Sequence, residues 1–236
     1  MHLLAIDTAT PQVGVAVGSD ENVVAQVRLA RGRRHAEQLA PAIRYAMDEA
    51  GVSATDLAAV AVGIGPGLFT GLRVGITTAK VMAQALSIPV VPVPSLDLVA
   101  YPVRFTDGVV AAVCDARRGE VYYALYRSVP GGVQRLDDYA VGDPGTLAGE
   151  LMALDGDALL VGDGALLYRD RLADEVSRAD FASAAFAYPS PAALIELAGA
   201  RYRREEFVRP ADVQAMYLRK SDAEIAWSGP PGPAQA

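Results

Sequence analysis

The chain has 236 residues, of which 52% are hydrophobic and 21% are charged, and its formal net charge is −7. This composition allows a substantial buried core and excludes an intrinsically disordered chain. The acidic balance disfavours autonomous binding to nucleic acid, for which a local basic patch or a partner would be needed. No apolar run is long enough to span a bilayer, Asp7 comes too early for a signal peptide, and Cys114 alone forms no internal disulfide. We therefore expect a globular cytoplasmic protein that does not bind membranes.

The first half of the chain has a strand-rich opening followed by alternating helices and strands. Short apolar runs predict strands, and apolar residues at helical spacing predict helices. In chain order the segments are predicted as strand, strand, strand, helix, strand, helix and strand: 3–6, 13–17, 23–29, 34–50, 57–64, 70–86 and 90–93. Gly51 is placed to end the first helix. This order predicts a mixed α/β layer structure.

The second half begins in the same way as the first. An apolar strand ends in Asp115, as the first strand ends in Asp7, and each is followed by a turn and a second strand. The predicted strands are 109–114, 120–126, 133–141 and 158–161, with a helix over 146–154. The parallel predicts a duplicated unit, with an N-terminal lobe over 1–106 and a second lobe over 107–220. A chance likeness is the alternative, and residues 221–236 are expected to form a flexible tail.

Three stretches together resemble the TsaB (YeaZ) family of proteins. They are LLAIDTAT followed by VGVAV, the segment GIGPGLFTGLRVGITTAKVMAQAL over 63–86, and CDARRGEVYYALY over 114–126. The middle segment is the most specific. The resemblance implies an actin-like fold of the ASKHA and RNase H-like type, with two duplicated lobes of mixed sheets flanked by helices.

The same resemblance implies a function. It implies a non-catalytic, cofactor-free scaffold of the complex that forms N6-threonylcarbamoyladenosine (t6A37) in tRNA. The scaffold would bind and activate a TsaD-type catalytic paralogue and help recruit a TsaE-type ATPase. It would contact tRNA only through the complex, and it could form a homodimer when alone.

Two turns occupy the places where actin-like ATPases carry an acidic residue and a phosphate-binding hairpin. The first contains Asp7 and Thr8, and the second contains Asp115 and Gly119. Phosphate hairpins generally need glycines, because backbone N–H groups must approach the phosphates closely. The turn over residues 8–12 has no glycine, and the second turn carries two arginines. We interpret both as degenerate, with Asp and Thr side chains closing their own turns.

The glycine-rich segment 63–67 lies between a predicted strand and a predicted helix, where anions often bind. It lacks the Lys-Ser/Thr ending of a P-loop, so we interpret it as a tight connection with Thr70 as a helix cap. His2 and His35 are the only histidines and form no metal-binding pair, which argues against a metallopeptidase. No metal is expected. Cys114 is interpreted as a small buried hydrophobe.

The helix over 70–86 carries small residues at every fourth position, at which another helix could approach closely. Its other faces are also apolar, which favours burial by a partner; burial within the fold is the alternative. In the family this helix and the one before it form the dimerisation surface. The candidate interface residues are Gln38, Ala42, Tyr45, Gly71, Val74, Gly75, Thr78, Val81 and Met82.

A small basic cluster near the end, Arg201 to Arg204, contains one tyrosine and is followed at once by Glu205 and Glu206. A solvated helix end is favoured over an RNA contact. The alternative to the scaffold is a stand-alone actin-like ATPase or kinase, which would need glycine-rich hairpins and a catalytic aspartate.

Overall fold

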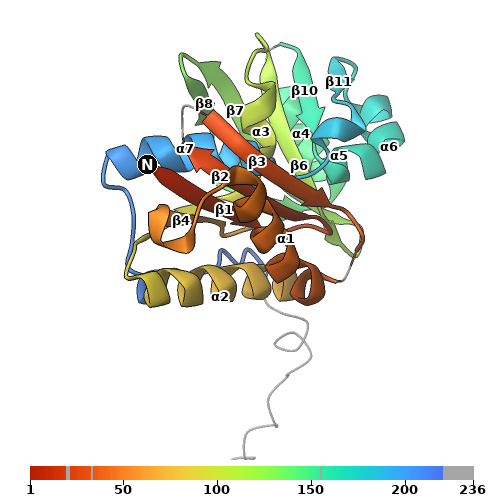
Figure 1. Ribbon diagram of the computed structural model, residues 1–236. Helices are drawn as coiled ribbons and strands as arrows, with labels where there is room; N and C mark the ends of the chain where they lie inside the picture. The colour runs from red at the N-terminus through yellow and green to blue at the C-terminus, as the bar shows by residue number, and fades with distance from the viewer. Residues whose placement is uncertain (20–21, 33, 155, 220–236) are drawn as a thin grey trace, which may run out of the picture.

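The computed structural model describes residues 1–19, 22–32, 34–154 and 156–219, so the predicted tail over 221–236 lies outside the described residues. The first sheet has five strands in the order β3-β2-β1-β4-β5 (Figure 1). These strands are β1 (His2–Asp7), β2 (Val13–Ser19), β3 (Asn22–Leu29), β4 (Leu57–Gly63) and β5 (Val90–Val93). β1, β2 and β3 are antiparallel neighbours, whereas β4 and β5 continue the sheet in parallel to β1.

The second sheet repeats this arrangement, with the order β8-β7-β6-β10-β11. Its strands are β6 (Val109–Arg117), β7 (Glu120–Val129), β8 (Gly132–Arg135), β10 (Ala158–Val161) and β11 (Ala179–Phe181), and β9 (Ala140–Gly142) also pairs with β7. Three antiparallel strands are again followed by two parallel ones. The shared order confirms the duplicated α/β fold predicted from the sequence.

One predicted strand, 133–141, is wrong because the segment forms two strands. β8 pairs with the end of β7 and β9 with its beginning. Between them Asp137 and Asp138 are exposed, and the Tyr139 hydroxyl donates to Asp97 Oδ1 at 2.8 Å. These side chains leave the ladder, so the pairing is interrupted.

Helices cover both faces of the first sheet. α1 (His35–Ala50) and α2 (Phe69–Leu86) lie on one face, and α7 (Pro191–Arg203) lies on the other (Figure 1). β1 alternates accordingly: Leu4 and Ile6 pack with α1 and α2, whereas Leu3 and Ala5 pack with α7. α7 belongs to the predicted 107–220 segment and yet completes the core of the first sheet. The lobe boundaries stay a prediction.

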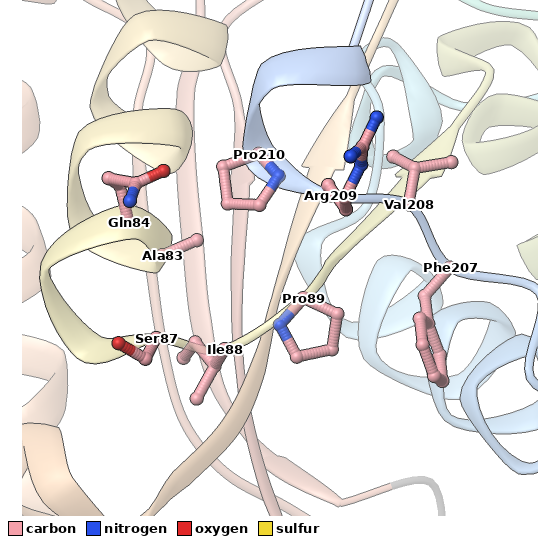
Figure 2. A pocket seen from close by; sticks show the side chains of 9 residues that line it. All are labelled: Ala83, Gln84, Ser87, Ile88, Pro89, Phe207, Val208, Arg209 and Pro210. Carbon is pink, nitrogen blue, oxygen red and sulfur yellow. The ribbon is translucent and has the colours of Figure 1, made fainter.

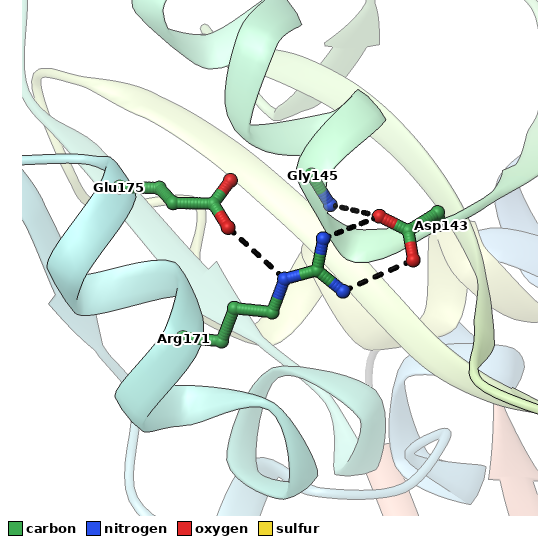
Figure 3. Close-up of polar contacts among 4 residues, drawn as sticks. All are labelled: Asp143, Gly145, Arg171 and Glu175. Carbon is green, nitrogen blue, oxygen red and sulfur yellow. Dashed lines mark hydrogen bonds and ion pairs between the residues drawn. The ribbon is translucent and has the colours of Figure 1, made fainter.

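The second lobe is built from shorter helices around its sheet. α4 (Pro144–Ala153) packs against β7 and α6 (Arg169–Glu175), and α6 also contacts β11. α5 (Asp163–Leu167) follows β10 and packs against β6. Figure 3 shows Arg171 of α6 donating to both oxygens of Asp143, the N-cap residue of α4, and to Glu175. α3 (Ser95–Ala100) packs against the opposite face of β6 and so connects the lobes. Four 3-10 turns complete the described elements: Ala54–Asp56, Tyr101–Val103, Ala184–Phe186 and Pro210–Asp212.

Helix ends follow local chemistry. α1 ends at Gly51, whose φ of 62° is the left-handed conformation that favours glycine, as predicted. Within the described part of the chain, none of the helices combines the length and apolar character needed to cross a bilayer.

Candidate functional site

The carboxylate of Asp7 lies at the end of β1 and is fully enclosed by the chain. Its Oδ1 accepts from the Ala9 amide at 3.1 Å, and its Oδ2 accepts from Ser95 Oγ at 2.8 Å. Burial raises the pKa of Asp7, and the hydrogen bonds from Ser95 and Ala9 oppose that rise. A side chain at Gly63 would overlap Oδ2, so β4 approaches the carboxylate closely. Both oxygens of Asp7 are therefore hydrogen-bonded to groups of the same chain.

The threonines of the first turn also bond within the chain. Thr10 Oγ1 accepts from the Gln12 amide at 3.4 Å, and Thr8 Oγ1 donates to the carbonyl of Gly71 at 2.7 Å. The bonds from Ala9 to Asp7 and from Gln12 to Thr10 support the interpretation that Asp and Thr side chains close this turn. The bond of Thr8 joins the turn to α2.

The segment before α2 packs directly on the same turn. The Leu68 amide donates to the Ala9 carbonyl at 2.7 Å, and a Cβ at Gly67 would overlap Ala9. Leu68 is the N-cap residue of α2 and has no side-chain cap, while Thr70 is exposed in the first turn. The expectation that Thr70 caps the helix is wrong, because docking on Ala9 places the N-cap at Leu68, two residues earlier.

The second hairpin carries an ion pair. Asp115 accepts from the Arg117 amide at 2.8 Å and pairs with Arg117 Nη1 at 3.0 Å. Arg117, Arg118 and Gly119 have φ values of 63°, 58° and 82°, so only one of the three left-handed positions has the glycine that suits it. Asp163 Oδ1 accepts from the Asp115 amide at 3.0 Å. Burial, with a smaller contribution from the Asp115 charge, raises the pKa of Asp163 to about 6.

The structure brings the two hairpins to one cavity of about 560 Å³. The cavity is lined by residues of the first hairpin, of α1 and of α2, and by Arg117 of the second hairpin. His35 also lines it, and its Nε2 lies 2.8 Å from the Thr10 carbonyl. The sequence alone did not indicate Ser95 or Asp163, although each lies two residues after a short apolar strand and begins a helix. Among the described residues no group of three or more His, Cys, Asp or Glu side chains has the arrangement of a metal site.

A second cavity, of about 390 Å³, lies at the C-terminal end of α2 (Figure 2). Ile88 and Pro89 lead from the helix into β5, and residues 207–210 pass alongside. Val90 and Val208 exchange two backbone hydrogen bonds, at 2.9 and 3.0 Å. These bonds cover part of the edge strand β5.

The predicted interface residues divide into inner and outer positions. Gly71 and Gly75 are buried against Thr8, and Ala42 is buried in the core of the first lobe. The small-residue ridge of α2 therefore packs within the chain, which was the alternative to a partner helix. Exposed Tyr45 and Val81 lie on the outer side, and the remaining four are half-buried: Gln38, Val74, Thr78 and Met82.

Known proteins match the sequence of this chain over almost its whole length. A family model described as "TsaD: tRNA N6-adenosine threonylcarbamoyltransferase" matches residues 23–227. The protein named TsaB from Bacillus subtilis is 30% identical, over 96% of this chain and 98% of its own. The TsaB of Escherichia coli is 32% identical over 98% and 99%. The chain belongs to the TsaB family.

Structural comparison agrees with this assignment. YeaZ from Pseudomonas aeruginosa superposes on the TsaB-family chain with a TM-score of 0.78 and 32% identity, covering 92% of this chain and 99% of that one. A ROK hexokinase from Thermus thermophilus, at 16% identity and a TM-score of 0.50, shares the fold alone. The relatives named TsaB are described as tRNA threonylcarbamoyladenosine biosynthesis proteins. The family predicted from sequence is confirmed, and it is a family of t6A biosynthesis.

Proposed function

We propose that this TsaB-family chain is a non-catalytic scaffold of the cytoplasmic t6A machinery and binds a TsaD-type paralogue through the outer faces of α1 and α2. The observation that carries the proposal is the exposure of apolar side chains on these two helices. Tyr45 is 58% exposed and Val81 is 63% exposed. Neither side chain is needed for the core of the first lobe or for the packing of the small-residue ridge of α2.

The exposed side of α2 carries further apolar surface beside Val81. Half-buried Val74, Thr78 and Met82 follow one another at intervals of four residues, beside Val81. α1 contacts α2 on the same face of the sheet, so Tyr45 adds to this apolar surface. Single exposed apolar residues are normal, but a group containing Tyr and Met resembles the centre of a protein interface. We name these five residues the outer face.

The non-catalytic part of the proposal is supported by the first hairpin. Its buried Asp7 is bonded to Ser95 and Ala9, and the Ala9 carbonyl accepts from Leu68. A phosphate bound here would have to displace contacts that hold α2 in place. In the proposed scheme the carbamoyl transfer occurs on the paralogue, a TsaE-type ATPase joins the complex, and the chain forms a homodimer when the paralogue is absent.

The experiment replaces an outer-face residue with a charge. We expect Val81→Asp to melt like wild type, since Val81 is exposed, but to lose binding to TsaD in pull-down and activity in reconstituted t6A formation. Met152→Asp is the matched control, because Met152 is 59% exposed on α4 of the other lobe. Normal TsaD binding by folded Val81→Asp would place the interface elsewhere.

A further inference from the structure

A third cavity, of about 460 Å³, lies between the turn of the β7–β8 hairpin and the last turns of α7. Its volume is within the range of small-molecule sites. Arg135 of β8 and Arg201 and Arg204 at the end of α7 line it, and Asp97 is the single acidic residue among the lining side chains. In a chain with a net charge of −7, three guanidinium groups thus lie at one hollow.

The floor of this cavity is a fixed hydrogen-bond network around Asp97. Its Oδ1 accepts from the hydroxyls of Tyr126, at 2.9 Å, and Tyr139, at 2.8 Å, and its Oδ2 lies 3.6 Å from Arg201 Nη2. Arg201 Nη1 donates to the Pro92 carbonyl at 2.6 Å. Burial and the Asp97 charge raise the pKa of both phenols, so they remain donors to the carboxylate. Asp97 is therefore occupied by partners on the floor, and Arg201 is held in place.

The two remaining guanidinium groups lie at the rim. Arg135 stacks over the ring of Tyr139 at 3.9 Å, and its acidic neighbour Asp138, at 3.8 Å, has a fully solvated side chain. Arg204 pairs with Glu206 at 2.7 Å, and these side chains are 59% and 50% exposed. Exposed ion pairs contribute little to stability. Arg204 holds Glu206 through two hydrogen bonds, at 2.7 and 3.1 Å, but both side chains are exposed. Each arginine can therefore exchange its surface carboxylate for an incoming phosphate, which offers the same paired oxygens and more charge.

The hairpin turn leaves room for such an anion. Gly131 has a φ of 84°, and apart from its chain neighbours no atom of the described residues lies within 4 Å of the position that a Cβ would take. A ligand can thus approach the backbone here without a side chain in the way. Guanidinium groups match the oxygens of phosphate in pairs, and a doubly charged phosphate suits several arginines better than a single carboxylate does.

We propose that this cavity binds a phosphate group, held at the rim by Arg135 and Arg204 with Arg201 behind them. The phosphate belongs either to a free nucleotide or to an RNA strand, since both present the same oxygens. The site lies away from the outer face of α1 and α2. If no phosphate binds at this site, the proposed TsaD interface is unaffected.

The test titrates the purified chain with AMP, adenosine, inorganic phosphate and a short single-stranded RNA, followed by NMR and calorimetry. We expect AMP to bind and adenosine not to bind. Binding of RNA that exceeds AMP and weakens steeply with salt identifies an RNA strand as the source, whereas binding of AMP or phosphate without such RNA binding identifies a free ligand.

Variants locate the site. The double change Arg135→Gln and Arg204→Gln should weaken phosphate binding at least about tenfold, while Arg135→Lys with Arg204→Lys should retain part of it, because charge remains and the paired geometry is lost. Arg209→Gln is the control, since Arg209 is an exposed arginine paired with Asp212 in the same manner. Equal binding of adenosine and AMP, no binding of any phosphate at millimolar concentration, or an equal loss in Arg209→Gln would each overturn the proposal.

Discussion

Gly75 provides a direct test of how α2 packs on the first hairpin. A methyl group at this position would lie well inside the separation of about 3.5 Å that non-bonded heavy atoms keep, and the atom it would meet is Thr8 Oγ1. Thr8 Cβ and Ile6 Cγ2 already stand in van der Waals contact with the same point, at 3.5 and 3.6 Å, so the methyl cannot move toward them. Gly75→Ala must therefore shift either the helix or Thr8.

Three contributions set the change in the free energy of unfolding that Gly75→Ala should cause. Overpacking a dense core costs about 1–3 kcal/mol. Displacing Thr8 also weakens its 2.7 Å bond to the Gly71 carbonyl, at about 1 kcal/mol. Alanine in place of glycine inside a helix returns about 1 kcal/mol. We expect Gly75→Ala to lower the free energy of unfolding by about 1–3 kcal/mol, measured by urea titration with circular dichroism.

Two companion variants make the result specific. Outside its own helix turn, no described heavy atom lies within 4 Å of the Cβ position of Gly149 in α4, so Gly149→Ala should raise stability by up to about 1 kcal/mol. Thr8→Ala combined with Gly75→Ala should cost less than the sum of the single changes, because the clashing oxygen is gone. If Gly75→Ala is as stable as wild type and shows no coupling to Thr8, α2 does not rest on this hairpin and the reasoning is refuted.

Three further outcomes are expected. Burial raises the pKa of the Asp163 carboxylate to about 6 in the folded chain, so its charge destabilises the fold as pH rises. Between about pH 4 and pH 7, Asp163→Asn should therefore gain stability relative to wild type, on the order of 2–3 kcal/mol. Thermal melts that show the same difference at both pH values would contradict this. The side-chain hydrogen bond from Arg171 lowers the pKa of Asp143 below its ordinary value, so the stabilisation is fully present above that ordinary value and is lost as pH falls through the lowered one. Arg171→Ala should therefore reduce the melting temperature at neutral pH, and thermal melts should show this reduction shrinking as the pH is lowered below about 4. Phosphate-release assays should find no turnover of Mg-ATP, and turnover abolished by Asp7→Ala would favour the ATPase alternative. In the Arg135→Gln, Arg204→Gln double variant, which lacks the proposed phosphate site, calorimetry should find no micromolar Mg-ATP binding at the Asp7 hairpin.

Much of the fold could be predicted because long segments repeat one pattern. The β5 strand over residues 90–93 was predicted with its observed limits, and α2 differs from its predicted range by one residue. Both segments are bounded by clear changes in residue type. The single strand over 133–141 failed because the pattern of apolar residues does not reveal that Tyr139 bonds to Asp97, a residue distant in the chain.

The candidate surface was harder to predict for a related reason. Small residues at every fourth position mark a place of close approach, but they do not identify what approaches. For Gly71 and Gly75 it is Thr8, which lies 63 residues before Gly71 in the sequence. The order of the segments predicts one lobe over residues 107–220, and order alone does not indicate that α7 packs on the first sheet.

The position of α7 has a consequence for the order in which the protein forms during translation. Leu194, Ile195 and Ala198 fill one side of the first sheet, although that sheet is complete in sequence by Val93. A nascent chain therefore exposes this side of the sheet until nearly all of the second lobe has been synthesised. Contacts of such long sequence separation form late and slowly. A chain that stops before Pro191 should emerge with an uncovered apolar sheet that binds chaperones and aggregates, even though every strand of both sheets is present.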